Sequence, residues 1–207
     1  NRRRSEEIFE AIYRDLYATY HHQLSSDSRP HGGKEPAWMK RLRIIDSTTI
    51  SLFSNLIFKG VGRHPKNGKK KGGIKVHTVI QANEGVPSDI RFTSAATNDS
   101  FMLKPSSLSK GDIIAMDRAY IHYEKFEQMT QKGIMYVTKM KKNLKYNIQD
   151  DTIVQTEDGV AELRIQSVTF TKALKDNQEP IIHHARIITY VDIKKHRFIS
   201  LLTNDMD

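Results

Sequence analysis

The chain has 207 residues, 38% of them hydrophobic, which is enough for a real core, and wholesale disorder is not expected. It has no cysteine, and this excludes disulfide bonds, thiolate zinc sites and cysteine nucleophiles. The formal net charge of +9 favours a polyanionic partner such as nucleic acid. No signal peptide opens the sequence and no apolar stretch approaches the roughly 20 residues of a membrane span, so we expect a cytoplasmic protein.

The region 1–40 predicts a helix followed by a linker. Within 5–24, hydrophobic side chains recur every four positions, the spacing of one face of an α-helix. The positions with this spacing are Ile8, Ile12, Leu16 and Tyr20. The segment "SSDSRPHGGKEP" at 25–36 has the composition of a loop, so we expect a connection there.

The region 41–144 alternates between strand and helix patterns, which predicts one α/β domain. The segments that predict strands are "RLRIIDSTTISLF", "GIKVHTVIQA", "SDIRFTSA", "DIIAMD" and "IMYVTKM". A hairpin turn is expected at "ANEGVP" and a helix over 122–132. Three strands with short connections, followed by strand, helix and strand, predict a mixed sheet flanked by helices.

The region 145–207 differs, because its strand-like runs are separated by turn signals and show little helical period. The two longest runs are "TIVQTEDGVAELRIQSVTF" and "HHARIITYVDIKKHRFISLLT". We therefore expect a β-rich insertion or appendage toward the C-terminus.

Two of the predicted strands run into an aspartate. Asp46 follows Ile44 and Ile45, and Asp117 follows the apolar run 113–116. Continuous apolar runs predict strands buried on both faces, at the centre of a helix-covered sheet. If the two strands are neighbours, about 4.8 Å apart, the two carboxylates repel each other unless a cation lies between them.

A hard divalent cation would suit such a pair. Carboxylate oxygens without cysteine favour Mg²⁺ or Mn²⁺, and two such ions about 3.5–4 Å apart can promote phosphodiester cleavage. The alternative is purely local, with Asp46 capping a turn with Ser47 and Asp117 capping the helix over 122–132. The spacing of the residues leaves both interpretations open.

A basic, glycine-rich loop, "GRHPKNGKKKGG", occupies 62–73. Beside a DNA site it would neutralise phosphates without reading bases, whereas elsewhere it would be an ordinary solvated loop. The basic residues that we expect to contact DNA are Arg63, Lys66, Lys69, Lys70, Lys71 and Lys75.

Further polar residues lie near the two aspartates in the sequence. By strand alternation His77 shares a face with Lys75, and it is either a satisfied sheet histidine or lines the site. Arg118 either orients Asp117 or a phosphate, or makes a surface salt bridge. Asn98 and Asp99 are expected to form a turn, because both side chains favour local bonds to the backbone.

In combination, these segments resemble the DDE transposases of the bacterial IS4 insertion-sequence family. "IIDSTTI" is similar to the family's first-aspartate strand, "GGIKVHTVIQANEGVP" to the hairpin after it, and "TNDS" to the turn closing the third strand. "IIAMDRAY" is similar to the second-aspartate strand, and "GIMYVTKMKKNLKY" and "FISLLTND" to the strands beyond, so the resemblance runs from about 41 to 205. Ala119 stands where many relatives have glycine.

The resemblance implies an RNase H-like fold with a β-rich insertion before a third acidic residue. It implies that Asp46 and Asp117 bind metal, with two Mg²⁺ or Mn²⁺ ions in the complete site. It also implies double-stranded DNA as partner, both transposon ends and target, a homodimer assembled on that DNA, and association with the bacterial nucleoid.

The third acid is where the chain departs from the family. The family's glutamate lies on a helix with the pattern Tyr-x-x-Arg-x-x-x-Glu-x-x-x-x-x-x-Lys, and "YVDIKKHRF" supplies Tyr190 without the arginine or the glutamate. We do not assign the role to Asp205 or Asp207. Because the chain begins at Asn1 rather than Met and stops after "LLTNDMD", we expect a fragment truncated at both ends, with two of the three acids, that cleaves DNA poorly or not at all.

The sequence therefore predicts the catalytic-domain portion of a DNA transposase that cleaves transposon ends and transfers strands. One alternative is a metal-dependent nuclease of the same fold, which would produce nicks without joined strands. Another is a DNA-binding remnant without catalytic activity.

Overall fold

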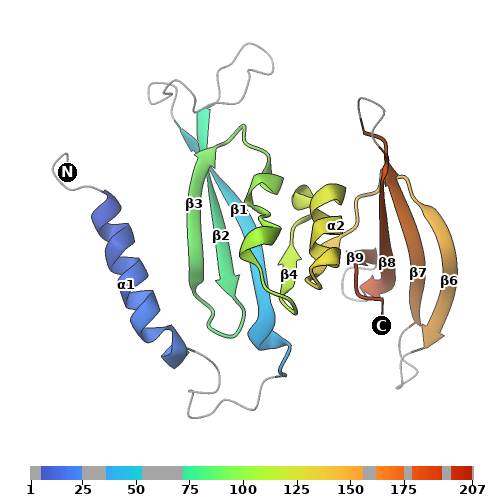
Figure 1. Cartoon of the computed structure of the whole chain (residues 1–207), viewed down its shortest axis with the longest axis horizontal. Coiled ribbons are helices and arrows are strands. Elements are labelled where there is room, and N and C mark those ends of the chain that lie inside the picture. The colour runs from blue at the N-terminus through green and yellow to red at the C-terminus, as the bar shows by residue number, and fades with distance from the viewer. Residues whose placement is uncertain are drawn as a thin grey trace.

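The computed structural model describes residues 6–24, 36–52, 72–155, 162–174, 179–192 and 197–206. Its strands are β1 (Leu42–Leu52), β2 (Gly72–Gln81), β3 (Pro87–Ser94), β4 (Ile113–Met116), β5 (Met135–Lys139), β6 (Asn147–Gln155), β7 (Glu162–Lys172), β8 (Ile181–Asp192) and β9 (Arg197–Thr203). The α-helices are α1 (Glu6–Leu24) and α2 (Tyr123–Gln131), and single-turn helices include η2 (Met39–Arg41), η4 (Asp99–Met102), η5 (Pro105–Ser107) and η6 (Arg118–Tyr120). The nine strands that the structure describes form one mixed sheet in the order β3-β2-β1-β4-β5-β9-β8-β7-β6 (Figure 1).

The first three strands form an antiparallel meander, and the hairpin predicted between the second and third of them is confirmed. The turn at "ANEGVP" joins β2 to β3, and Gly85 adopts φ 71° there, a conformation that costs glycine little. β4 then pairs with β1 in parallel, and β5 with β4 in parallel. The crossover between β4 and β5 carries α2, which confirms the helix predicted over 122–132.

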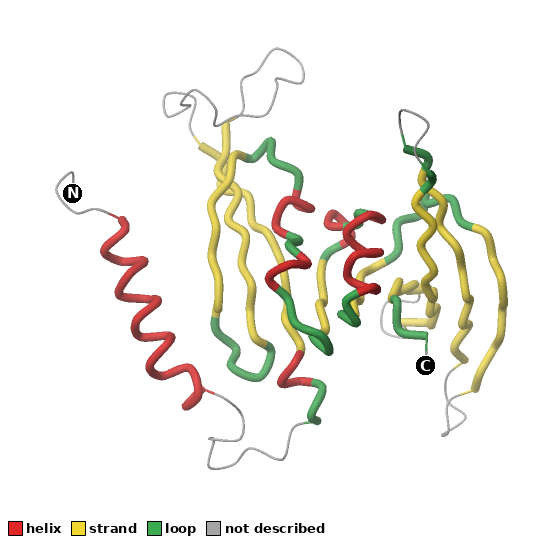
Figure 2. The backbone as a smooth tube through the Cα atoms, viewed as in Figure 1, coloured by secondary structure: helices red, strands yellow, loops and turns green. Residues whose placement is uncertain are grey.

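The hydrophobic core lies on one face of the sheet. Residues in register share a face, so Ile114 and Tyr136 point to the same side, where α2 packs. Phe126 of α2 is fully buried and stacks on Tyr136 with ring centroids 3.9 Å apart, and Tyr123 stacks on Phe170 at 5.0 Å. The single-turn helices between β3 and β4 run beside the sheet and extend this layer toward β1 (Figure 2).

The opposite face of the meander is open among the described residues. Ile44, Ile50, Ile90 and Phe92 project there by register, and 37% to 70% of each side chain is exposed. The expectation that the apolar strands are buried on both faces is therefore wrong for this part of the chain. A run of apolar residues fits a covered and an uncovered face equally well, so the pattern could not tell the two apart.

The β-rich region near the C-terminus continues the same sheet. β9 pairs with β5 through Val137 and Thr203, and β8, β7 and β6 follow as antiparallel neighbours. The described fold is thus a large mixed sheet with few helices, which is compatible with the RNase H-like class expected from the sequence.

The helix α1 lies beside the β2–β3 turn (Figure 1). The hydroxyl of Tyr17 donates to Glu84 at 2.6 Å, and His21 contacts the same carboxylate at 3.1 Å. Its apolar stripe, predicted at four-residue spacing, is half exposed. None of the helices that the structure describes combines the length and hydropathy needed to cross a membrane.

Candidate functional site: two aspartates on neighbouring parallel segments

Asp46 and Asp117 lie side by side on two neighbouring parallel segments of the chain. Ile45 of β1 is in register with Met116 of β4, and each aspartate is the next residue along the chain. Neighbouring strands are about 4.8 Å apart; β4 ends at Met116, just before Asp117, whereas β1 continues past Asp46 to Leu52. The prediction that the acid-bearing strands are adjacent is confirmed, and both aspartate side chains are exposed.

Each aspartate also makes a local hydrogen bond. The backbone N–H of Ser47 donates to Oδ1 of Asp46 at 2.7 Å, and that of Ala119 donates to Oδ1 of Asp117 at 2.8 Å. Asp117 thereby caps η6 rather than α2, whose N-cap residue is His122, so the predicted cap of the helix over 122–132 is wrong. These bonds fix one oxygen of each carboxylate and leave Oδ2 without a partner among the described residues.

The two carboxylates have the chemistry that a hard divalent cation requires. Both are exposed, both offer an oxygen, and their backbones are neighbours across adjacent strands, which fits Mg²⁺ or Mn²⁺. Among the residues that the structure describes, no group of three histidine, aspartate or glutamate side chains could hold a metal ion. The described site is therefore a pair.

A buried polar cluster lies next to this pair, and Asp99 is at its centre. Its Oδ1 accepts hydrogen bonds from the hydroxyl of Ser47 at 2.8 Å and from the ammonium of Lys75 at 3.0 Å. Burial alone would raise the pKa of Asp99, but the bonds from Ser47 and Lys75 and the charge of Lys75 lower it below its ordinary value. Asp99 is therefore a stable anion at neutral pH.

This pairing changes the interpretation of Lys75. The sequence grouped Lys75 with the DNA-contacting lysines, but its side chain is buried and also donates to the carbonyl oxygen of Thr97 at 2.9 Å. A lysine with two buried acceptors is not presented to a DNA phosphate. Lys75 is buried because side chains alternate along β2, and this alternation turns Lys75 to the covered face together with His77.

His77 and Tyr120 complete the cluster, and both side chains are fully buried. His77 Nδ1 lies 3.4 Å from the hydroxyl of Tyr120, and Nε2 lies 2.8 Å from the hydroxyl of Thr93. Burial lowers the pKa of His77, so the ring is neutral near pH 7. Burial raises the pKa of Tyr120 to about 12, and the charges of Asp99, Asp46 and Asp117 also raise it.

The sequence found only part of this arrangement. Asn98 does form the predicted turn, because its side chain accepts from the backbone N–H of Ser100 at 3.0 Å. The roles of Asp99 and Tyr120 were missed. One signal in the sequence could have indicated the role of Asp99. Lys75 and His77 share one face of a strand, and if that face is covered, Lys75 requires an acceptor, which Asp99 in the nearby turn supplies.

Several other predicted site residues are less informative. Arg118 is exposed at the start of η6. The basic residues Arg63, Lys66, Lys69, Lys70 and Lys71 lie outside the described residues.

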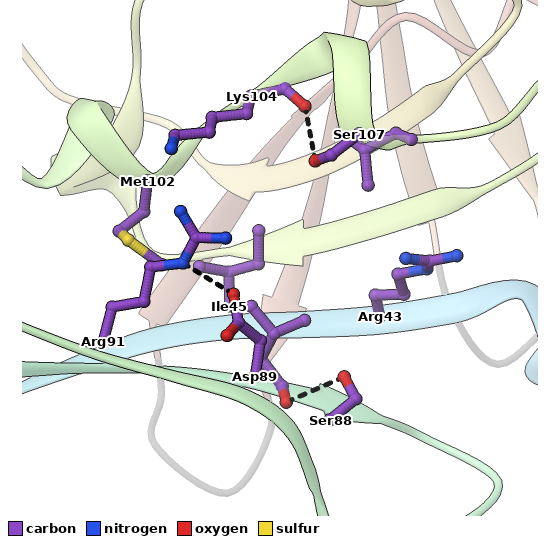
Figure 3. A pocket seen from close by; sticks show the side chains of 10 residues that line it. Arg43, Ile45, Ser88, Asp89, Arg91, Met102, Lys104 and Ser107 are labelled. Carbon is purple, nitrogen blue, oxygen red and sulfur yellow. Dashed lines mark hydrogen bonds and ion pairs between the residues drawn. The ribbon is translucent and has the colours of Figure 1, made fainter. Parts of the chain in front are cut away.

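A separate cavity of about 250 Å³ opens on the covered face, between the meander and the segment that carries η4 and η5. Figure 3 shows Arg91 beside Asp89, with Met102 and Lys104 on the far wall and Arg43 at one end. The Arg91 guanidinium is paired with Asp89 at 2.8 Å. Neither of the strand-end aspartates lines this cavity.

The chain matches the family described as "Transposase DDE domain" over residues 37–206. It is also 26% identical over 196 residues to a protein of Sinorhizobium fredii (strain NBRC 101917 / NGR234) named "Putative transposase y4zB". That alignment covers 94% of this chain and 51% of the relative, so the chain spans about half the length of the curated relative it matches. The family match covers most of the chain, and the chain therefore belongs to the transposase DDE domain family.

Proposed function

We propose that this chain is the catalytic-domain portion of a DNA transposase of the IS4 type. The observation that carries the proposal is the register of β1 and β4, which makes Asp46 and Asp117 neighbours across two parallel strands. Family membership gives this pair its chemical meaning, because the family is defined as a transposase domain. The proposed reaction is cleavage of a phosphodiester at a transposon end, followed by attack of the freed 3′ hydroxyl on a second strand.

In this proposal, Asp46 and Asp117 are the metal-binding and catalytic residues. Bound Mg²⁺ or Mn²⁺, two ions in the complete site, would supply the positive charge that activates a nucleophile and stabilises the leaving oxygen. The two side chains hold that charge at a fixed place beside the scissile phosphate. The local bonds from Ser47 and Ala119 orient each carboxylate, so positioning rather than covalent chemistry is the contribution of these residues.

DNA binding in this proposal depends mainly on charge. The net charge of +9 favours the polyanion, and the basic loop at 62–73 would contact its phosphates without reading sequence. Arg118 follows Asp117 directly and is exposed, so it can reach a phosphate bound at the pair. We also propose a homodimer assembled on paired DNA ends, acting in the bacterial cytoplasm at the nucleoid.

A DNA assay separates this proposal from the two alternatives, a metal-dependent nuclease and a DNA-binding remnant without catalysis. Full-length protein incubated with a labelled duplex and Mg²⁺ should give nicks and joined strands, whereas a nuclease would give nicks alone and a remnant would give neither.

The residue assignment is tested in the same assay. Asp117→Asn keeps the shape of the side chain and its bond from Ala119 but removes the charge, so it should abolish cleavage and leave DNA affinity within about twofold. Asp15→Asn, an exposed carboxylate on α1, is the matched control and should cleave normally. Near-normal cleavage by Asp117→Asn would reduce Asp117 to a cap of η6 and contradict the mechanism.

A further inference from the structure

The buried polar cluster joins the two segments that carry Asp46 and Asp117. Ser47 is the residue after Asp46, and Tyr120 is three residues after Asp117. Asp99 accepts from the hydroxyl of Ser47 and lies 4.0 Å from Nδ1 of His77, which lies 3.4 Å from the hydroxyl of Tyr120. Side chains from the two segments therefore meet on the covered side of the sheet.

Asp99 anchors this meeting point. The hydroxyl of Ser47 donates to its carboxylate at 2.8 Å, and Lys75 both neutralises that carboxylate at 3.0 Å and ties it to the carbonyl oxygen of Thr97. Asp99 belongs to η4, whose position is fixed by the Asn98 cap and by the ammonium of Lys125, which donates to the carbonyl oxygens of Ser100 and Leu103. The acceptor thus stands on a well-held segment.

Tyr120 is held just as firmly. Its ring is fully buried in the hydrophobic core, and its hydroxyl lies 3.4 Å from His77, which Thr93 fixes from the other side. A tyrosine held in this way restrains the η6 turn. That turn is capped by Asp117 itself, so a shift of Tyr120 would move the carboxylate.

We propose that Asp99 is a positioning residue for the two-aspartate site. It holds Ser47 directly and faces His77, which in turn contacts Tyr120, so the spacing between Asp46 and Asp117 is set by polar contacts on the covered side of the sheet. This inference rests on the proposed function, because it assumes that the two aspartates bind metal. Asp99 itself is not offered as a ligand, since Ser47 and Lys75 already occupy its Oδ1.

A cluster that merely stabilises the fold would behave differently from one that sets the spacing of the aspartates. Removal of a stabilising hydrogen bond lowers the resistance of the whole chain to denaturant and leaves the metal affinity of the folded protein unchanged. Removal of a positioning bond lowers the metal affinity of protein that is still folded. The test therefore measures both quantities on the same samples.

The experiment titrates Mn²⁺ into this chain and follows free Mn²⁺ by electron paramagnetic resonance, with circular dichroism in urea as the second readout. The variants Tyr120→Phe and Ser47→Ala each remove one hydroxyl of the cluster. We expect each to weaken Mn²⁺ binding by about three- to tenfold, less than Asp46→Asn, because a positioning error costs less than removal of a ligand.

Two further variants make the result specific. The double variant Asp99→Asn with Lys75→Met removes both charges of the buried pair together. The net charge is therefore unchanged and only the geometry is tested. This double variant should also weaken Mn²⁺ binding. Thr189→Val removes a comparable bond, between Thr189 and Ser200 at 2.8 Å in β8 and β9, and should shift the urea midpoint without changing Mn²⁺ affinity.

The outcomes separate this inference from the function on which it rests. If Asp46→Asn fails to weaken Mn²⁺ binding, the metal site itself is wrong and the positioning role falls with it. If Asp46→Asn weakens binding but the cluster variants bind like Thr189→Val, the metal site stands and the positioning role alone is overturned.

Discussion

Asp46 and Asp117 occupy equivalent positions on two parallel strands, each one residue beyond the registered pair Ile45 and Met116. This relationship answers how two apolar runs can each lead into a carboxylate. A buried charge without a partner is costly, and here both side chains are exposed, Asp46 within β1 and Asp117 directly after β4, where solvent and a cation can reach them. The structure therefore gives the two acids a common location without placing either inside the core.

The first prediction concerns stability without metal. Asp46→Asn and Asp117→Asn each remove one of two neighbouring negative charges and keep a side-chain oxygen to accept the local N–H bond. We expect each variant to fold, with a free energy of unfolding within about 0.5 kcal/mol of the unmodified chain or slightly higher. Urea denaturation in chelator measures it, and a decrease of more than about 2 kcal/mol would show that these carboxylates are structural.

A second prediction concerns pH. Burial lowers the pKa of both His77 and His183, although the bond to Glu127 opposes this for His183. Each histidine is neutral in the folded protein and takes up a proton more readily when unfolded. Stability is therefore complete above about pH 6.5 and falls as the pH drops below that value, by at most about 1.4 kcal/mol per pH unit for each histidine.

Urea denaturation between pH 7.5 and 5 checks this. His183→Gln keeps a hydrogen-bonding side chain opposite Tyr136 but cannot titrate, so the variant should be less stable overall and lose less stability on acidification. Thr189→Val, which removes the bond between Thr189 and Ser200 and no titrating group, is the control; it should lower stability equally at every pH. If the His183→Gln variant loses stability with falling pH as steeply as the unmodified chain, His183 is not a neutral buried histidine.

The sequence predicted much of the sheet because its signals are local. The hairpin at "ANEGVP", α2 and the strands that lead into Asp46 and Asp117 follow from turn residues and from periodicity. Their adjacency was inferred from the apolar runs and is confirmed by the register of Ile45 and Met116. These features depend on residues close together in the chain.

The remainder depends on contacts between distant segments, which no local pattern encodes. The sequence predicted Asp99 as a turn residue, and it is one. Its second role, as the acceptor in an ion pair with Lys75, could not be predicted because Lys75 lies 24 positions earlier in the chain. Lys75 looked like one more basic residue of a DNA-binding group, and only the covered side of β2 shows that its charge is already neutralised. Which face of the meander is covered could not be derived from strands whose residues are apolar on both sides.

A third prediction tests the basic loop. Replacing Lys69, Lys70 and Lys71 with alanine should weaken binding to any DNA duplex to a similar extent. It should also flatten the slope of log affinity against log salt by about 0.9 for each DNA phosphate that a lysine no longer neutralises. Fluorescence anisotropy at several salt concentrations measures both, with two duplexes of unrelated sequence.

The control for this prediction changes net charge by the same amount at three described positions. Lys40, Lys110 and Lys132 each lie shortly before the start of a parallel strand, whereas the two aspartates follow Ile45 and Met116 further along. Replacing these three should leave the salt slope nearly unchanged. Equal slopes for both triple variants would mean that overall charge, rather than the loop, determines DNA affinity.

The most direct test of the proposed mechanism is whether Asp46 and Asp117 bind one divalent cation as a unit. Mn²⁺ affinity is measured for the chain, for Asp46→Asn, for Asp117→Asn and for the double variant, with Asp15→Asn as control. We predict that each single change weakens binding at least about tenfold, equivalent to about 1.4 kcal/mol, and that the double change costs little more, because residues that act together are not additive. Single variants that bind Mn²⁺ as tightly as the control would contradict a shared metal site and, with it, the mechanism proposed for this domain.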